Sequence, residues 1–478
     1  MSYSRFILGT FLAVILATFG EPVTRAQQVA NAPDVKHVAT ETQTPADPAA
    51  AAKSSENPLT WHGLTLYGTI DIGLLSESNG RPYNNNFGTG FETIIAPNGN
   101  ESITHYADNG LAQSVIGIRG DEPLGKGASL IFKLEPGFNP VSMRFTNVQK
   151  ALVMNNGIAK PNQTANTDGP RAGRIDNGFA FFGVHTAKFG TATFGRQFSL
   201  FAENTSKYDP IAGSYAFSLI SYIPFVGGAG DVQDAFLDQS LKYTLQIKHY
   251  RAGFLEQFTG NNPVFSPDHV YGSARQFTLG GDYHRFSMDV AYGKRHDGIY
   301  ASTLSATQIL TLPTNSLAAT ISDNEAYLAM GKYTVGRYRI TAGYDHTRYA
   351  NPSTPLVAPI TEIGGYEMSF LTQNAYNVNK ILQVYWTGLK TSVTKKLDIT
   401  GAYYGWRQNS YSGNGCTNNS SPKCSGDMNV ISGVGTYKLP HGFTAYGGME
   451  WSYVINGSSY TYLANHNILT MFGGQYHF

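Results

Sequence analysis

The last eleven residues alternate between an apolar, aromatic face and a more polar face. Counting back by twos, the first face contains Phe478, Tyr476, Gly474, Phe472, Thr470 and Ile468. A β-strand shows this pattern when one face contacts lipid and the other contacts water. An aromatic ring at the end of such a strand suits a membrane interface, because it can be partly buried and partly hydrated. We therefore expect these residues to form the closing strand of an outer-membrane β-barrel.

The first 60 residues differ in composition from the rest of the chain. Met1 to Arg5 carries one positive charge, Phe6 to Phe19 is a short apolar run, and a polar stretch ends at Ala26. This layout is typical of a secretory signal peptide with cleavage after Ala26; a membrane anchor would need about 20 apolar residues. Ala, Pro, Thr, Asn and Gln dominate residues 27–60, which favours a flexible periplasmic segment. The predicted organisation is a signal peptide (1–26), this segment (27–60) and a barrel (61–478).

The composition excludes several classes of protein. Without residues 1–26, the chain has 32 basic and 32 acidic residues, so no nucleic-acid partner is expected. Charged residues make up 14% of the chain, against about 25% in soluble proteins. Aromatic residues reach 13% and glycines number 52. A barrel accounts for this mixture, because each of its strands combines lipid-facing and water-facing residues.

Period-two alternation recurs from Leu64 onwards. Leu64, Leu66, Ile70, Ile72 and Leu74 share one face, and Thr65, Tyr67, Thr69 and Asp71 share the other. Similar alternation occurs near residues 116–119, 129–135, 240–245, 277–283 and 443–451, with charges almost always on the second face. This pattern predicts antiparallel strands. We interpret Trp386, Trp406 and Trp451 as interface residues on the outer surface.

The predicted connections alternate between short and long. Short turns are predicted at 122–126, 187–190, 284–285, 335–337, 394–396 and 440–441. Long loops are predicted at 76–111, 140–174, 199–237, 297–322, 350–377 and 410–427. Short turns on one rim and long loops on the other indicate an all-β transmembrane barrel of about sixteen strands. A soluble β-sandwich or propeller explains neither this asymmetry nor the charge-free faces.

Several segments resemble the general diffusion porins of Gram-negative bacteria, in particular the trimeric neisserial and Burkholderia type. The matching segments are Leu64-Thr65-Leu66-Tyr67-Gly68-Thr69-Ile70-Asp71, Ile116 to Gly125, Phe132 to Phe138, Phe182-Gly183-Val184, Phe189 to Gln197, Asp238 to Tyr243 and the final Phe478. They occur in the family's order and anchor both ends of the barrel. Residues 260–430 match only in general style.

The resemblance implies a homotrimer in the bacterial outer membrane, in contact with lipids and lipopolysaccharide, with a third loop folded inward. That loop is residues 199–237, whose acidic side chains would face a basic barrel wall across a wet constriction. The candidate constriction residues are Glu203, Asp209, Asp231, Asp234, Asp238, Arg196, Lys133 and Lys242. From the strand pattern, the candidate pore-lining residues are Tyr67, Asp71, Arg119 and Glu135. Val115 and Phe236 stand where the family often has arginine, so we expect weak cation selectivity.

Four other features of the sequence bear on possible chemistry. Gly120-x4-Gly125-Lys126 lacks the Ser or Thr and the following helix of a phosphate-binding loop, so a hairpin turn is preferred. Cys416 and Cys424 are the only cysteines, and in an exported chain they predict a local disulfide. The twelve histidines have no metal-binding spacing, and Asp231 and Asp234 are preferred as fixed charges over a catalytic pair. No cofactor, metal site or catalytic residue is predicted.

The predicted function is passive diffusion of small hydrophilic solutes and ions across the outer membrane. Alternatives are a porin specific for a sugar or an acid, an outer-membrane enzyme, and an adhesin that uses a barrel as its scaffold. Tyr208, Tyr215, Phe217 and Tyr222 in the third loop could form a sliding surface for sugars, but packing of this loop against the wall is preferred.

Overall fold

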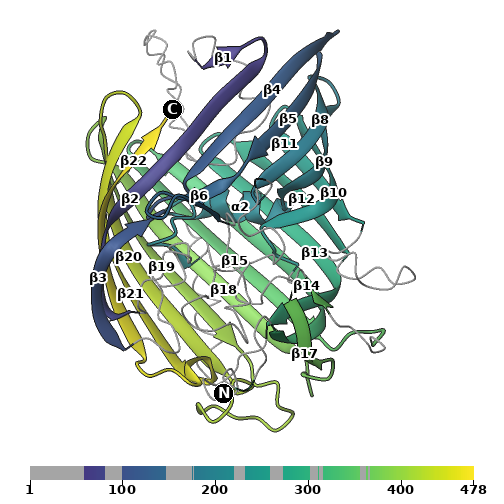
Figure 1. The fold of residues 1–478 in the computed structure, drawn as a ribbon, viewed down its shortest axis with the longest axis vertical. Coiled ribbons are helices and arrows are strands. Elements are labelled where there is room, and N and C mark those ends of the chain that lie inside the picture. The colour runs from purple at the N-terminus through teal and green to yellow at the C-terminus, as the bar shows by residue number, and fades with distance from the viewer. Residues whose placement is uncertain are drawn as a thin grey trace, which may run out of the picture. The chain divides into compact units, whose positions relative to one another are not determined.

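The computed structural model describes residues 59–80, 100–146, 175, 177–219, 232–258, 273–301, 311, 316–355, 362–363 and 366–478. The predicted signal peptide and nearly all of the segment 27–60 lie outside these residues. The described part of the chain is almost entirely β-structure (Figure 1). None of its helices is long and apolar enough to cross a membrane.

The β-strands of the described residues form a single sheet, and sixteen of them make up the wall of a closed barrel. The wall strands are β2 (Leu64–Gly80), β4 (Val115–Gly125), β5 (Ala128–Glu135), β8 (Phe179–Thr186), β9 (Gly190–Phe198), β10 (Phe236–Ile247), β11 (Tyr250–Gln257), β12 (Ala274–Tyr283), β13 (Phe286–Ala301), β14 (Ser316–Val335), β15 (Tyr338–Ala350), β18 (Lys380–Ser392), β19 (Leu397–Gln408), β20 (Gly426–Lys438), β21 (Phe443–Asn456) and β22 (His466–His477). The predicted fold of about sixteen antiparallel strands is confirmed.

Shorter elements lie between these wall strands. They are β1 (Thr60–Trp61), β3 (Glu101–Asp108), β6 (Gly137–Asn139), β7 (Arg144–Thr146), α2 (Leu200–Tyr208), β16 (Glu362–Ile363), β17 (Tyr366–Thr372) and the 3-10 helix η5 (Gly457–Ser459). The predicted loop 76–111 therefore contains ordered strand, because β2 extends to Gly80 and β3 pairs with its second half. β17 runs parallel to β14, whereas the wall strands pair antiparallel.

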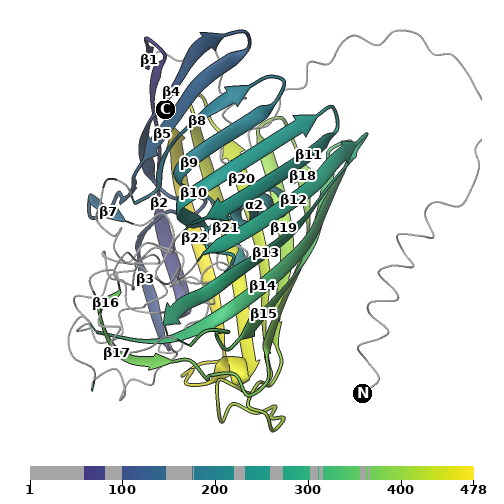
Figure 2. The same ribbon diagram turned by 90° about the vertical axis from the view of Figure 1, so that its right-hand side faces the viewer.

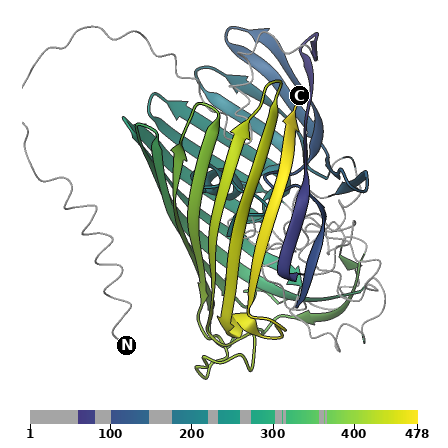
Figure 3. The ribbon, with the colours of Figure 1, turned by 90° about the vertical axis from the view of Figure 1, so that its left-hand side faces the viewer.

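The barrel closes where β22 pairs with β2, which are the yellow and purple strands that lie side by side in Figure 3. Gly68 and Phe478 complete this seam through two backbone hydrogen bonds of 3.0 and 3.1 Å. A Cβ atom at Gly68 would lie 2.4 Å from the Phe478 ring, so the ring needs a glycine beneath it. The rings of Tyr476 and Phe478 stack on the outward face, with centroids 5.8 Å apart. The final strand thus closes the sheet as the alternation predicted.

The outward face carries the apolar residues that the sequence assigns to lipid. Along β12, Phe277 and Leu279 are exposed, whereas Gln276 and Thr278, which alternate with them, are buried inside the barrel. The same alternation holds along the other wall strands, whose outward face is dominated by exposed Leu, Ile, Val, Met, Phe, Tyr and Trp. Figure 2 shows β9 to β15 as a steeply tilted set of neighbouring strands.

Charges on the outward face mark the edge of this apolar surface. Glu256, Arg275, Lys294, Glu325 and Arg348 lie opposite one another on β11 to β15, near the ends that lead into the long loops. Arg275 pairs with Glu256, and Arg348 pairs with Glu325 at 2.7 Å. Charges therefore occur on the outward face more often than predicted, and they gather at one level because charge is tolerated near the interface.

In the loop between β19 and β20, a disulfide joins Cys416 to Cys424, whose Cα atoms are 4.8 Å apart. The Ser425 N–H also donates a 3.0 Å hydrogen bond to the Cys416 carbonyl oxygen. This loop is thus fixed at its base by a covalent and a hydrogen-bonded crosslink.

Leu279 provides a test of which face contacts lipid, because its side chain is 62% exposed on the outward face of β12. Leu279→Arg should destabilise the folded barrel by about 2–4 kcal/mol, the cost of a cation near the bilayer midplane. Denaturant titration in phospholipid vesicles measures this change. Gln246→Arg is the control, because Gln246 is exposed on the inward face of β10. Equal destabilisation by both variants would contradict the assigned faces.

Candidate pore constriction

The connection between β9 and β10 enters the barrel and begins with helix α2 (Figures 1 and 2). The Ser199 hydroxyl accepts a 3.1 Å hydrogen bond from the Ala202 N–H and caps the first turn. Asp209 precedes Pro210, and a residue before proline disfavours helical geometry, so α2 ends at Tyr208. Pro210 then packs on Gly388 of β18, where a Cβ atom would lie only 2.4 Å away. The sequence signalled a loop here, and the structure adds a capped helix within it.

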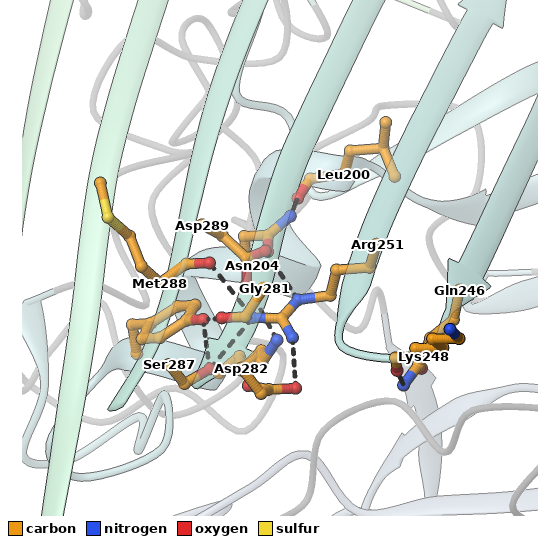
Figure 4. A network of polar contacts seen from close by, with 12 residues as sticks. Leu200, Asn204, Gln246, Lys248, Arg251, Gly281, Asp282, Ser287, Met288 and Asp289 are labelled. Atoms are coloured by element: carbon orange, nitrogen blue, oxygen red, sulfur yellow. Dashed lines mark hydrogen bonds and ion pairs between the residues drawn. The ribbon is translucent and has the colours of Figure 1, made fainter. Parts of the chain in front are cut away.

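Arg251 of β11 fixes α2 to the wall (Figure 4). Its Nε donates to Asp289 at 2.7 Å and its Nη1 donates to Asp282 at 2.6 Å. Its Nη2 donates to the Tyr208 hydroxyl at 2.8 Å. Lys207 reaches the same Asp289 at 2.9 Å. Burial lowers the pKa of Lys207, and the adjacent Asp289 carboxylate opposes that shift. Two cations and two carboxylates thus form one network at the C-terminal end of α2.

The loop after α2 is anchored to the opposite part of the wall. Tyr404 of β19 donates to the Asp209 carboxylate at 2.6 Å, and the Trp386 indole donates to the Tyr208 carbonyl at 2.9 Å. Burial raises the pKa of Asp209, with the Tyr404 hydrogen bond opposing this shift. The Ser214 hydroxyl donates to the Gly110 carbonyl, between β3 and β4, at 2.8 Å. The described part of the loop therefore reaches from its root at β9 along the wall to the region beside β2.

Two of the three predicted outer-surface tryptophans lie inside the barrel. Trp386 is 2% exposed and bonded to the loop, and Trp406 packs against the buried apolar cluster. Only Trp451 is exposed on the outward face. The interface assignment was wrong for Trp386 and Trp406, because the loop supplies an apolar surface inside the barrel that a water-filled lumen would lack.

An apolar cluster joins the loop to the wall. From the loop it includes Tyr208, Ile211, Phe217 and Leu219, and from the wall it includes Met330, Val384, Val430 and Met471. Tyr208 and Phe217 are fully buried, which fits packing of the loop rather than an aromatic sliding surface. Tyr215 is half-buried, and Tyr222 lies outside the described residues.

The returning end of the loop follows the wall back to β10. The Val232 N–H donates to Asn324 at 2.7 Å, and Gln233 donates to Asp345 at 2.6 Å and to Thr347 at 2.8 Å. Asp234 then forms a buried ion pair of 2.7 Å with Arg295 of β13.

The acidic residues predicted to face a basic wall across a gap are instead in contact with their nearest wall residues. Glu203 forms an ion pair with Lys242, and Asp238 forms one of 2.7 Å with Arg196. Arg196 also donates to the Asn177 carbonyl and lies over the Phe236 ring. Asp209 is buried against Tyr404, and Asp231 lies outside the described residues. Wall cations thus neutralise Glu203 and Asp238, and Asp209 anchors the loop through its hydrogen bond with Tyr404. Direct contact between opposite charges is favoured here because an unpaired buried charge is costly.

The remaining predicted residues lie on β2, β4 and β5. Tyr67 donates to Glu135 at 2.7 Å, and Lys133 pairs with Glu135 at 3.0 Å. The Arg119 guanidinium lies 5.1 Å from the Tyr67 ring. These four side chains form one inward cluster.

Asp71 differs from its predicted role in lining the pore, because its side chain is fully buried. It accepts backbone hydrogen bonds from Gly110, Leu111 and Ala112, and side-chain hydrogen bonds from Tyr446 and Gln475. A carboxylate with five donors is well suited to hold the turn between β3 and β4.

Sequence reasoning missed a group of basic residues, Lys332, Arg339, Lys390 and Lys438, which we call the basic strip. They face inward near the short turns on β14, β15, β18 and β20. Lys390 pairs with Asp398 at 2.9 Å. Within the described residues, no ion pair joins the other three to a carboxylate. The sequence did hold a signal for their inward direction. Each of them lies an even number of residues from a buried residue on its own strand, as Lys332 does from Met330.

No group of three or more His, Cys, Asp or Glu side chains suited to a metal ion occurs among the described residues. Comparison with known proteins found no match among curated sequences. Structural similarity was found to an anion-selective porin from Comamonas acidovorans (TM-score 0.57, 13% identity, covering 87% of this chain and 99% of that one). The trimer form of OmpT, an outer membrane protein of Vibrio cholerae, matches with a TM-score of 0.53 and 13% identity, covering 87% of this chain and 99% of that one. OmpF of Salmonella typhi in complex with daunomycin matches with a TM-score of 0.50 and 15% identity, covering 87% of this chain and 97% of that one.

At these identities the structural similarity establishes the fold. The sequence profile of the Gram-negative porins matches residues 44–454, which is most of the chain. The chain therefore belongs to the Gram-negative porin family and forms an outer-membrane β-barrel channel.

Proposed function

We propose that this channel passes small hydrophilic solutes and ions by passive diffusion, and that it favours anions. The observation that carries the ion preference is the basic strip, in which Lys332, Arg339 and Lys438 have no ion-pair partner among the described residues. By contrast, Glu203, Asp234 and Asp238 each contact a wall cation. Ions entering the lumen then meet uncompensated positive charge, which concentrates anions locally. This proposal reverses the weak cation preference inferred from Val115 and Phe236.

Export by a cleaved signal peptide, contact with lipids and lipopolysaccharide, and action as a channel rather than an enzyme are parts of the same proposal. The apolar outward face supports the lipid contact. Glu203, Asp234 and Asp238 serve as ion-pair partners, and Asp71 and Asp209 as hydrogen-bond acceptors, which supports a role of these residues in structure rather than in catalysis.

We also propose that three copies assemble as a homotrimer. β5 and β8 have 8 residues each, fewer than the about 9–11 that a tilted strand needs to cross the hydrocarbon core. Their outward face carries Phe132 and Phe182, which are exposed in one chain. Because β5 and β8 are short, lipid would contact loop backbone beyond their ends. A neighbouring subunit could cover this part of the wall. The trimer form of OmpT is consistent with this arrangement.

The ion preference is tested by reversal potentials of the full-length protein in planar bilayers under a KCl gradient. The wild type should give the sign expected for chloride as the more permeant ion. Lys332→Glu should shift the potential toward potassium, because it replaces an uncompensated lumen cation by an anion. Lys294→Glu, the same change on the outward face, should leave the potential unchanged. A cation-selective wild type, or equal shifts in both variants, would refute the proposed role of the strip.

Trimerisation predicts that a single insertion produces three equal conductance levels that close stepwise. Native mass spectrometry of the detergent-solubilised protein should give three times the subunit mass. Single-level openings together with a monomeric mass would exclude the trimer while leaving the channel proposal intact.

Anchoring of α2 predicts that Arg251→Gln destabilises the barrel by about 3 kcal/mol, because Asp289 is 2% exposed and loses its main partner. Asp289→Asn in the same chain should restore part of that loss, and a double-mutant cycle from denaturant titrations measures the coupling. Arg285→Gln in the adjacent exposed turn is the control. Additive effects of the Arg251 and Asp289 changes would show that the two side chains are not energetically coupled and would contradict this prediction.

A further inference from the structure

The basic strip brings like charges together within the barrel ladder. Arg339 on β15 lies directly opposite Lys390 on β18, and both face inward. Lys332 on β14 pairs with Thr341, two residues from Arg339, and so occupies the diagonal position. Like charges directly opposite each other destabilise a sheet. An anion bound in the lumen would offset a cost of this kind.

Asp398 offers only partial compensation. It pairs with Lys390 at 2.9 Å, and its hydroxyl partner is Ser392 at 2.6 Å. Lys332, Arg339 and Lys438 make no ion pair or side-chain hydrogen bond with any residue in the described ranges. Lys332, Arg339 and Lys390 are half-buried and Lys438 is exposed, so water and ions can reach all four.

The strip has one end at the constriction and one at the barrel rim. The Lys332 ammonium lies 5.4 Å from the ring of Tyr208, the last residue of α2. Lys438 is the last residue of β20, beside the short turn to β21. An anion passing along this wall would therefore meet successive cations between the loop helix and the rim.

We propose that the basic strip is a saturable binding site for small doubly charged oxyanions. This inference rests on the proposed diffusion channel and specifies the solutes that it retains. A guanidinium can bind two oxygens of one oxyanion, while the neighbouring ammonium groups add point charges. A dianion neutralises two of the three uncompensated cations, whereas chloride or a monocarboxylate neutralises one. Phosphate, phosphate monoesters and dicarboxylates share this chemistry.

The test is inhibition of the chloride current in planar bilayers by inorganic phosphate at pH 7.5 and constant ionic strength. Glycerol phosphate, succinate and acetate are added in parallel. Half-inhibition by the dianions should occur at concentrations at least tenfold below that of acetate. Inhibition by phosphate and glycerol phosphate alone would identify phosphoryl groups as the ligand, and inhibition by succinate alone would identify dicarboxylates; either supports the site.

Substitutions in the basic strip test whether the strip is the site of this inhibition. Arg339→Gln should raise the half-inhibiting phosphate concentration at least tenfold, and Lys332→Gln should raise it severalfold. Arg339→Lys keeps the charge but cannot form the bidentate hydrogen bonds of a guanidinium, so it should give an intermediate half-inhibiting phosphate concentration. Lys294→Gln removes an outward cation and should leave the value unchanged. If Arg339→Gln fails to fold, Lys332→Gln and Lys438→Gln carry the comparison.

Equilibrium dialysis of radiolabelled phosphate against the detergent-folded protein gives a readout that does not need conduction. Saturable binding that is lost in Arg339→Gln supports the site even if no current is seen, a result that would refute only the channel proposal. An anion-selective channel that dianions inhibit no better than acetate, with no saturable phosphate binding, would overturn this inference and leave the diffusion channel in place.

Discussion

Closure of the sheet is the constraint on which the rest of the structure depends. Backbone N–H and C=O groups in a bilayer have no water to pair with, so an open sheet edge there is strongly disfavoured. The pairing of β22 with β2 removes the last edge and ends with the two hydrogen bonds between Gly68 and Phe478. Once the circle is closed, every strand has one face toward lipid and one toward the interior. Side-chain parity then decides which residues can act on a solute.

The inward loop divides that interior into two kinds of surface. On β14 and β18 to β22, the wall beneath the loop is apolar and packs against residues such as Phe217 and Leu219. Near the short turns of β14, β15, β18 and β20, the wall is basic and open to water. Two polar contacts on different parts of the wall fix the loop near the C-terminal end of α2: the Arg251 network, which holds Tyr208, and the hydrogen bond from Tyr404 to Asp209, the residue after the helix. Its position therefore depends on both burial and specific pairing.

The strand pattern was predictable because lipid imposes it on every wall strand, and in the structure Tyr67, Lys133 and Glu135 lie together on one inward face. The partners of the loop residues were not predictable, since they come from strands that are distant in the sequence, as Tyr404 is 195 positions from Asp209. Trp386 was misassigned because tryptophan is common both at membrane interfaces and in packed interiors. The sequence around it did hold a signal: Leu382, Val384 and Trp386 alternate with residues that include Tyr385 and Leu389, so both faces of β18 are apolar. A wall strand with two apolar faces must be covered on the inside.

The ion preference that we propose differs from the one expected from the sequence, because local pairing matters more than the formal charge of a loop. An acidic residue contributes to the field across a lumen only if its charge is not cancelled by a cation in direct contact. Glu203, Asp234 and Asp238 each have such a cation. In the proposed channel, the field in the lumen is then set by charges that no ion pair cancels. Three of the four residues of the basic strip, Lys332, Arg339 and Lys390, lie within residues 260–430, where the sequence resembles the family only in general style.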